Sequence, residues 1–284
     1  MFTVLDRISW PGYADRANED SCGAAGPWAW VIDTFIPPGT PAALHPSSDA
    51  AWLAGFATDR LTALAPGFED GAALARRVMT ETRDAFLAAA PPERHDFMTW
   101  PAGAMTLVRG RAGRLDVWTF GDTSAFLRRP DGAVEVVGEA PEMRVAERAK
   151  AKEFLEATGT TPGRVLDTAP FRDWLRGRRE EQRAGGGLPL LSLRPEAADA
   201  LRHDSLALEP GTAVLLTSDG LSAIVDLYEA VDPAGLMERA LREGLESLAR
   251  EARRIETEVD PAGRLYPRFK VSDDCTGLLV RWDG

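Results

Sequence analysis

The sequence predicts an α+β fold in which helices cover the outer faces of two antiparallel sheets. Short apolar runs typical of buried strands lie near both ends of the chain and in its middle. Two longer amphipathic segments separate the first strands from the middle ones, and further helical segments precede the last strand. This order of elements favours two sheets with helices packed on their outer faces. The 284 residues, 44% of them hydrophobic, suffice for a substantial core, and we expect residues 1–284 to form a single domain.

The first half of the chain is expected to supply strands and a pair of helices. Residues 2–9 and 28–32 have strand patterns, and the polar segment 15–21 opens or bridges a strand. Ser48 begins a helix, because it directly precedes a broad apolar face, and a second helix covers residues 70–89. An antiparallel meander of four short strands is expected next, at 104–108, 115–120, 125–127 and 134–137.

The second half begins with a change of pattern. Over residues 141–204, charged helical segments alternate with Gly and Pro. Because strands resume afterwards, we interpret this region as a helical insertion and not as a separate domain. The buried strand 214–217 follows it. We expect a helix over 221–230, a long helix over 233–256 and a final strand over 276–282.

Composition excludes several classes of partner. The formal charge of -11 argues against nonspecific binding to nucleic acid or to an anionic membrane, since both need a basic surface. No stretch approaches the roughly 20 apolar residues that span a bilayer, and the first residues lack the pattern of a secretion signal. The two cysteines imply no disulfide framework. We therefore expect a cytoplasmic protein; its oligomeric state is left open.

Acidic residues recur at the ends of the predicted strands. Any one of them alone is best explained as a surface charge. Clustered carboxylates, however, raise one another's pKa unless a cation lies among them. With oxygen ligands and no neighbouring His or Cys, such a cluster would select Mg²⁺ or Mn²⁺. The residues are Glu19, Asp20, Asp33, Asp122, Asp219 and Asp273.

Six short motifs stand in a fixed order along the chain. They are N-E-D at 18–20, V-I-D at 31–33, G-A-M-T at 103–106, G-D-T-S-A at 121–125, S-D-G-L at 218–221 and D-D-x-T at 273–276. In this order and strand context the chain resembles the metal-dependent serine/threonine protein phosphatases, the type 2C or PPM class. The resemblance spans residues 16–282. It implies a four-layer α-β-β-α sandwich of two antiparallel sheets flanked by helix pairs, and it makes the insertion at 141–204 a flap.

The resemblance also implies roles for particular residues. Asp33 would bridge two Mn²⁺ or Mg²⁺ ions, and Asp219 and Asp273 would bind one of them. Further ligands would be Glu19 or Asp20 and the backbone carbonyl of Thr34. Asp122 corresponds to a residue near a third, weaker ion, and Arg16 to an arginine that binds the substrate's phosphate. The catalytic set is thus Asp33, Asp219 and Asp273.

Three departures from the family pattern affect these expectations. The loop after Asp33 lacks the family's glycines, Arg16 stands one position closer to Glu19 than usual, and Ala223 replaces an aspartate of the third ion site. The function implied is hydrolysis of phosphoserine and phosphothreonine in proteins by a water that bridges the two ions. Two alternatives remain open: a catalytically weak domain that binds phosphoproteins or regulates them, and a hydrolase of small phosphate esters.

Overall fold

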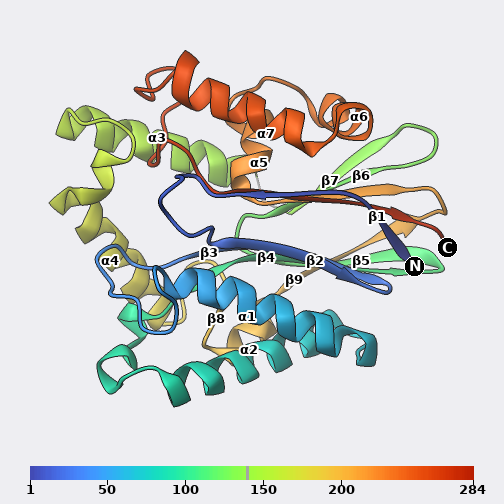
Figure 1. Cartoon of the computed structure of the whole chain (residues 1–284), viewed down its shortest axis with the longest axis horizontal. Helices are drawn as coiled ribbons and strands as arrows, with labels where there is room; N and C mark the ends of the chain where they lie inside the picture. The colour runs from blue at the N-terminus through green and yellow to red at the C-terminus, as the bar shows by residue number, and fades with distance from the viewer. Residues whose placement is uncertain (139–140) are drawn as a thin grey trace.

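The computed structural model describes residues 1–138 and 141–284, and the side chains of all of these except 141–143. Two antiparallel sheets pack face to face, and helices cover the outer face of each (Figure 1). The first sheet has the order β1-β11-β10-β6-β7, and the second has the order β2-β3-β4-β5-β9, with β8 paired to β4. The predicted α+β sandwich is therefore confirmed.

The strands of each sheet come from distant parts of the chain. The first sheet consists of Phe2–Trp10 (β1), Ser124–Arg128 (β6), Val134–Val137 (β7), Ala213–Thr217 (β10) and Cys275–Trp282 (β11). The second consists of Asp20–Ala25 (β2), Trp28–Phe35 (β3), Ala102–Arg111 (β4), Gly113–Phe120 (β5), Leu191–Ser192 (β8) and Arg202–Leu208 (β9). The main helices are Asp49–Leu64 (α1), Gly71–Ala89 (α2), Pro141–Thr158 (α3), Ala169–Arg183 (α4), Asp219–Asp226 (α5), Pro233–Glu243 (α6) and Leu245–Arg254 (α7).

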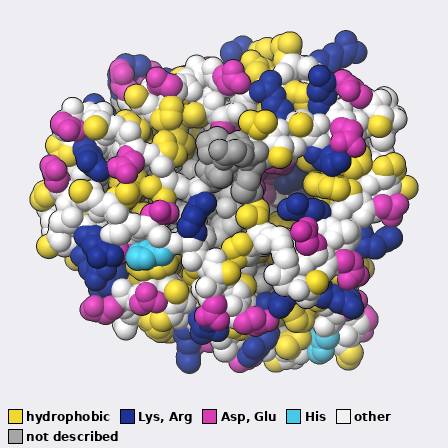
Figure 2. Space-filling model, turned by 180° about the vertical axis from the view of Figure 1, so that it is seen from behind, with side chains coloured by type: hydrophobic (Ala, Val, Ile, Leu, Met, Phe, Trp, Pro, Cys, Tyr) yellow, Lys and Arg dark blue, Asp and Glu magenta, His cyan; other side chains and the backbone are white. Residues whose placement is uncertain are grey.

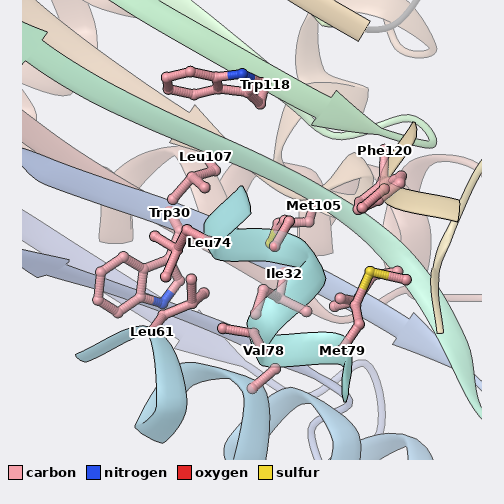
Figure 3. Close-up of a cluster of buried hydrophobic side chains, with 14 of the residues drawn as sticks. Trp30, Ile32, Leu61, Leu74, Val78, Met79, Met105, Leu107, Trp118 and Phe120 are labelled. Carbon is pink, nitrogen blue, oxygen red and sulfur yellow. The ribbon is translucent and has the colours of Figure 1, made fainter. Parts of the chain in front are cut away.

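Apolar side chains on both faces of the sheets explain the layers. One cluster lies between the sheets and includes Val31, Val117 and Val280. A second joins the second sheet to α1 and α2, where Trp30 and Ile32 pack with helix residues such as Leu61 and Leu74 (Figure 3). A third joins the first sheet to α5, α6 and α7. Since burying one such side chain contributes roughly 1.5–3 kcal/mol, these three clusters hold the four layers together.

The predicted starts of the first two helices agree with the N-cap residues in the structure. Ser48 is the N-cap of α1, and its Oγ accepts a hydrogen bond from the Ala50 amide at 3.1 Å. Asp70 is the N-cap of α2, and its Oδ1 accepts from the Ala73 amide at 2.8 Å. Each cap satisfies an amide that the first helical turn leaves without a partner. None of the helices among the described residues is long and apolar enough to cross a membrane.

Three sequence predictions about elements are wrong. The four middle strands do not form one meander, because β4 and β5 belong to the second sheet and β6 and β7 to the first. The chain crosses between sheets at 121–123, where Gly121 has φ +64°. The expected helix 233–256 is broken at Gly244 (φ +83°) into α6 and α7. The helix after β10 ends at Asp226, four residues before the predicted end.

The insertion lies at the end of the sandwich opposite the two termini (Figure 1). Its helices α3 and α4 are joined to the rest of the chain by an aromatic cluster, in which the ring centroids of Phe171 and Phe269 are 5.0 Å apart and those of Trp174 and Phe269 are 5.5 Å apart. The predicted range 141–204 also takes in β8 and the first residues of β9, which pair with β4 and β5. Its final part thus extends the second sheet.

Candidate metal centre

Aspartates from both sheets meet at the insertion end of the sandwich. Asp20 and Asp33 face each other in the register of β2 and β3. Asp122 follows the end of β5, while Asp219 begins α5 just after β10. Asp273 precedes β11, whose first residues pair with the end of β1 and lie beside the end of β10. Antiparallel pairing therefore carries five residues that are distant in sequence to one edge of the two sheets.

The carboxylates are close enough to change one another's protonation. Burial raises the pKa of Asp33 well above its usual value. The negative charges of four acidic neighbours raise it further; these are Asp20, Asp219, Asp273 and Asp122. Burial likewise raises the pKa of Asp20 well above its usual value, with Asp274 as the next largest cause. Burial raises the pKa of Asp273 to about 6. Such a cluster is stable as carboxylates only with positive charge among them.

The chemistry of the donors fits a hard divalent cation. Asp20 is buried, and neither of its carboxylate oxygens has a partner at good hydrogen-bond geometry among the described residues, although Ser218 is near enough to lower its pKa. Asp219 Oδ1 likewise has no such partner among them. Buried oxygens without partners are costly, and a cation would compensate them. Among the side chains that the structure describes, those of residues 1–138 and 144–284, no three acidic, His or Cys groups stand together as ligands of one ion.

Two basic side chains already contact the aspartates. Lys270 Nζ lies 2.5 Å from Asp273 Oδ1, and Arg144 of α3 places NH1 3.4 Å from Asp219 Oδ2 and Nε 3.6 Å from Asp226 Oδ2. Burial lowers the pKa of Lys270, but the charges of nearby aspartates outweigh it and raise the pKa well above the usual value. Burial raises the pKa of Asp219, but the two cations outweigh it, so the net shift is downward.

The similarity to known proteins extends over nearly the whole chain. No protein-family model matches this chain, and no curated protein sequence matches it. Among solved structures, Stp1 of Staphylococcus aureus has a TM-score of 0.59 at 13% identity, covering 99% of this chain and 96% of that one. The PPM Ser-Thr phosphatase MsPP of Mycobacterium smegmatis, in complex with cacodylate, has 0.53 at 20% identity (99% and 100% covered). The catalytic domain of PstP with two manganese ions has 0.50 at 16% (99% and 97%).

The chain has the PPM phosphatase fold. At these identities the likeness shows the fold alone. The roles of the residues in the cluster have to follow from their own positions and contacts. Within the PPM fold, Glu19 and Asp20 have different surroundings. Asp20 faces Asp33, whereas Glu19 Oε1 accepts a hydrogen bond from the hydroxyl of Ser48 at the start of α1. Burial raises the pKa of Glu19. Of this pair, the structure brings Asp20 into the cluster of aspartates and places Glu19 against α1.

Asp274 fixes the loop that precedes β2. Its Oδ1 accepts from the Gly12 amide at 2.7 Å, and its Oδ2 accepts from the Glu19 amide at 2.6 Å. The second aspartate of the D-D pair therefore ties the β1–β2 connection to the segment that carries Asp273. The sequence analysis assigned Asp274 no role, although its place next to Asp273 was a signal.

Thr34 and Arg16 are placed differently from the aspartates. Thr34 is buried, and its hydroxyl donates to the backbone carbonyls of Glu19 (2.5 Å) and Ala50 (2.8 Å). This side chain fastens the end of β3 to α1. Arg16 is exposed, with its guanidinium carbon 4.9 Å from the centre of the Tyr13 ring. Its charge acts on Glu19, where it lowers the pKa against the larger effect of burial.

Arg144 and Lys270 were not predicted as site residues from the sequence. Lys270 stands three residues before Asp273, so its proximity to that motif was a usable signal. Arg144 had no such signal, because no short-range sequence pattern connects a helix of the insertion with the S-D-G segment. Asp122 is half-buried near Asp219: burial raises its pKa, and Arg144 and Lys270 are both near enough to act against that rise.

Proposed function

We propose that the protein is a metal-dependent phosphatase that hydrolyses phosphoserine and phosphothreonine in proteins. The observation that carries this proposal is the meeting of five aspartates at one edge of a PPM fold, with the buried carboxylate of Asp20 lacking partners at good hydrogen-bond geometry among the described residues. Acidic groups in this arrangement favour a bound cation over mutual repulsion. The phosphatase activity of the similar structures supports the choice of reaction.

The residues proposed to hold the ions come from both sheets. Asp33 lies among the other carboxylates and is proposed as the bridge, with Asp219 at the start of α5 and Asp273 just before β11 on one side. Asp20 is the better placed of the N-E-D pair, and Glu19 is proposed to act from the edge. The carbonyl of Thr34 would complete an all-oxygen set, which suits Mn²⁺ or Mg²⁺.

We propose two ions, as in the PstP structure. A third ion is not proposed, because Asp122 lies near two resident cations, Arg144 and Lys270, and Ala223 offers no ligand. When bound, the two ions would neutralise charge on the phosphoryl group and lower the pKa of an attacking water. The aspartates hold and orient them at the edge of the sheets.

Two arginines are candidates for binding the substrate's phosphate. A guanidinium pairs well with phosphate because two parallel N–H donors match two oxygens. Arg144 lies inside the cluster, with NH2 3.4 Å from Ser222 Oγ in addition to its aspartate contacts. Arg16 stacks on Tyr13 at the rim. We therefore propose Arg144 as the closer phosphate ligand, with Arg16 as an outer contact for the phosphoprotein.

The test is hydrolysis of a phosphoserine peptide by the full chain. We expect activity with Mn²⁺, its loss with EDTA, and its return when Mn²⁺ is added back. Asp33→Asn should lower kcat/KM by about 10²–10³-fold, the range for loss of one electrostatic element of such a site. Asp131→Asn, in an exposed turn, is the matched control and should keep full activity. Metal-independent hydrolysis by the unaltered protein would contradict the proposal.

One observation favours a second candidate, a phosphoprotein-binding domain with weak catalysis. Lys270 Nζ is 2.5 Å from Asp273 Oδ1, so an ammonium group competes with a metal for that carboxylate. Calorimetric titration of the metal-free chain with Mn²⁺ separates the candidates. Two binding events support the enzyme, and none supports the binding domain. A preference for small phosphate esters over phosphopeptides would indicate a different substrate class.

A further inference from the structure

A buried polar network lies behind the aspartate cluster, on the side of α5 and α7. Glu256 is fully buried and has a partner on each carboxylate oxygen. The Tyr228 hydroxyl donates to Oε1 at 2.9 Å, and Arg253 NH1 is 2.7 Å from Oε2. A buried carboxylate is costly unless it is paired and hydrogen-bonded, and here both conditions are met.

Arg253 also reaches the backbone beside the aspartates. Its NH2 donates to the carbonyl of Asp273 at 2.5 Å and to the carbonyl of Pro11 at 3.3 Å. Pro11 directly follows β1, and Asp273 lies two residues before β11. One guanidinium thus joins the end of the first strand to the start of the last one, at the position of a proposed metal ligand.

Arg253 and Glu256 stand three residues apart and so lie on one face of the helix. The segment Ile255–Val259 is a π-helical turn that continues α7. In such a turn each backbone hydrogen bond joins residues five apart, so the helix is wider than an α-helix. Turns of this kind are common at functional sites. The Glu256 carbonyl in turn accepts from Arg268 NH2 at 3.0 Å. The turn is therefore held both through the side chain of Glu256 and through its backbone carbonyl.

The far end of the network leads to a second proposed ligand. Tyr228 stands two residues after the end of α5, the helix whose first residue is Asp219. Its amide donates to the Ala223 carbonyl at 2.7 Å, so the backbone of Tyr228 is tied to α5 itself. Covalent and hydrogen bonds thus form a continuous path between the two aspartates. It runs from Asp219 through α5, Tyr228, Glu256 and Arg253 to the Asp273 carbonyl.

We propose that Arg253 is a positioning residue for the metal centre: it fixes the backbone of Asp273 and, through Glu256 and Tyr228, sets its position relative to Asp219. This inference rests on the proposed function, because it assumes that both aspartates bind a divalent ion. Groups behind the ligands orient them, and their removal commonly weakens metal binding by 10–100-fold.

The experiment measures Mn²⁺ affinity by calorimetry on the metal-free full chain. Arg253→Gln should raise the Kd of the ion proposed at Asp219 and Asp273 by about 10–100-fold, and Arg253→Lys, which keeps one donor near the carbonyls, should recover part of the loss. Arg250→Gln is the matched control. Arg250 lies one turn earlier in α7, pairs with Glu246 and stacks on Trp10, so its loss should leave the Kd within about twofold.

Thermal unfolding of the metal-free variants separates positioning from stability. A lower Tm for Arg253→Gln with an unchanged Mn²⁺ Kd would overturn the inference. Tyr228→Phe removes one hydroxyl and keeps the packing, so it serves even where Arg253→Gln fails to fold; a several-fold rise of the Kd supports the inference, and an unchanged Kd in both Tyr228→Phe and Arg253→Lys overturns it. If the unaltered protein binds no Mn²⁺, the proposed function itself is wrong, and this inference falls with it.

Discussion

The two sides of the aspartate cluster are built in different ways. On one side, Asp20 and Asp33 face each other in the register of β2 and β3, so backbone pairing fixes their separation. On the other side, Arg144 reaches Asp219 and Asp226 from the insertion through side-chain contacts of 3.4 and 3.6 Å. Backbone pairing thus fixes the positions of Asp20 and Asp33, whereas the printed contacts of Arg144 with Asp219 and Asp226 are made between side chains.

The largest effect should come from disturbing the sheet side. A Cβ on Gly103 would lie 2.2 Å from the Asp33 carbonyl oxygen, so strand β4 or β3 must shift. Gly103→Ala should lower the free energy of unfolding by roughly 1–3 kcal/mol and weaken Mn²⁺ binding, measured by urea denaturation and calorimetry.

Gly55→Ala provides the opposite control. Gly55 lies exposed within α1, and a Cβ there meets nothing within 4 Å. This substitution should stabilise the protein by about 0.5–1 kcal/mol, because alanine favours the helix. Equal unfolding free energies for the two alanine variants would show that the close approach at Gly103 does not constrain the strands.

A smaller and more selective effect is expected on the insertion side. Arg144→Gln should weaken inhibition by inorganic phosphate about tenfold, as expected for loss of a charge-assisted hydrogen bond of about 1.4 kcal/mol. The Mn²⁺ affinity should stay equal or increase, since Asp219 loses a competing cation.

Arg148→Gln is the comparison for that experiment. Arg148 lies one turn later in α3 and contacts Glu229 and the Leu265 carbonyl, not the aspartates. Phosphate inhibition should be unchanged. A fall in Mn²⁺ affinity in Arg144→Gln, with phosphate inhibition intact, would show that Arg144 supports the carboxylates instead of the substrate.

The smallest effect is expected on the outer surface of the insertion. Arg176 and Asp173 form an ion pair at 3.2 Å, and both side chains are 68% exposed. Solvent and salt screen such pairs, so Arg176→Gln should change the free energy of unfolding by about 0.2–0.5 kcal/mol. On the face seen in Figure 2, basic and acidic side chains are likewise interspersed. A change above about 1 kcal/mol would mean that α4 depends on this pair.

Local signals in the sequence were enough for most elements. Capping residues such as Ser48 and Asp70 marked where helices begin, because a side-chain oxygen must satisfy the first amides. Buried apolar runs gave the central strands. The edge strand β9 was missed, since its RHDSLAL sequence is mostly exposed and polar and has no continuous apolar run.

Long-range relations were harder to predict. The crossing between sheets at 121–123 depends on which partner strand is available, and a four-residue apolar run does not specify that. The break at Gly244 was hidden by apolar periodicity that continues through it. For the site, the motifs predicted Asp33, Asp122, Asp219 and Asp273 as neighbours. Arg144 required knowledge of how the insertion folds back, which no local pattern contains.

The pairing of β1 with β11 has a consequence for how the protein is made. These strands join Phe2 to Trp282 and Trp10 to Cys275, so almost the whole chain separates the partners. Contacts this distant in sequence form slowly, because a long loop must first be closed. In the order of synthesis, Asp273 comes after the four other aspartates of the cluster. A nascent chain therefore cannot assemble the full aspartate cluster until residue 273 has been synthesised, and metal capture would report that β1 and β11 have paired.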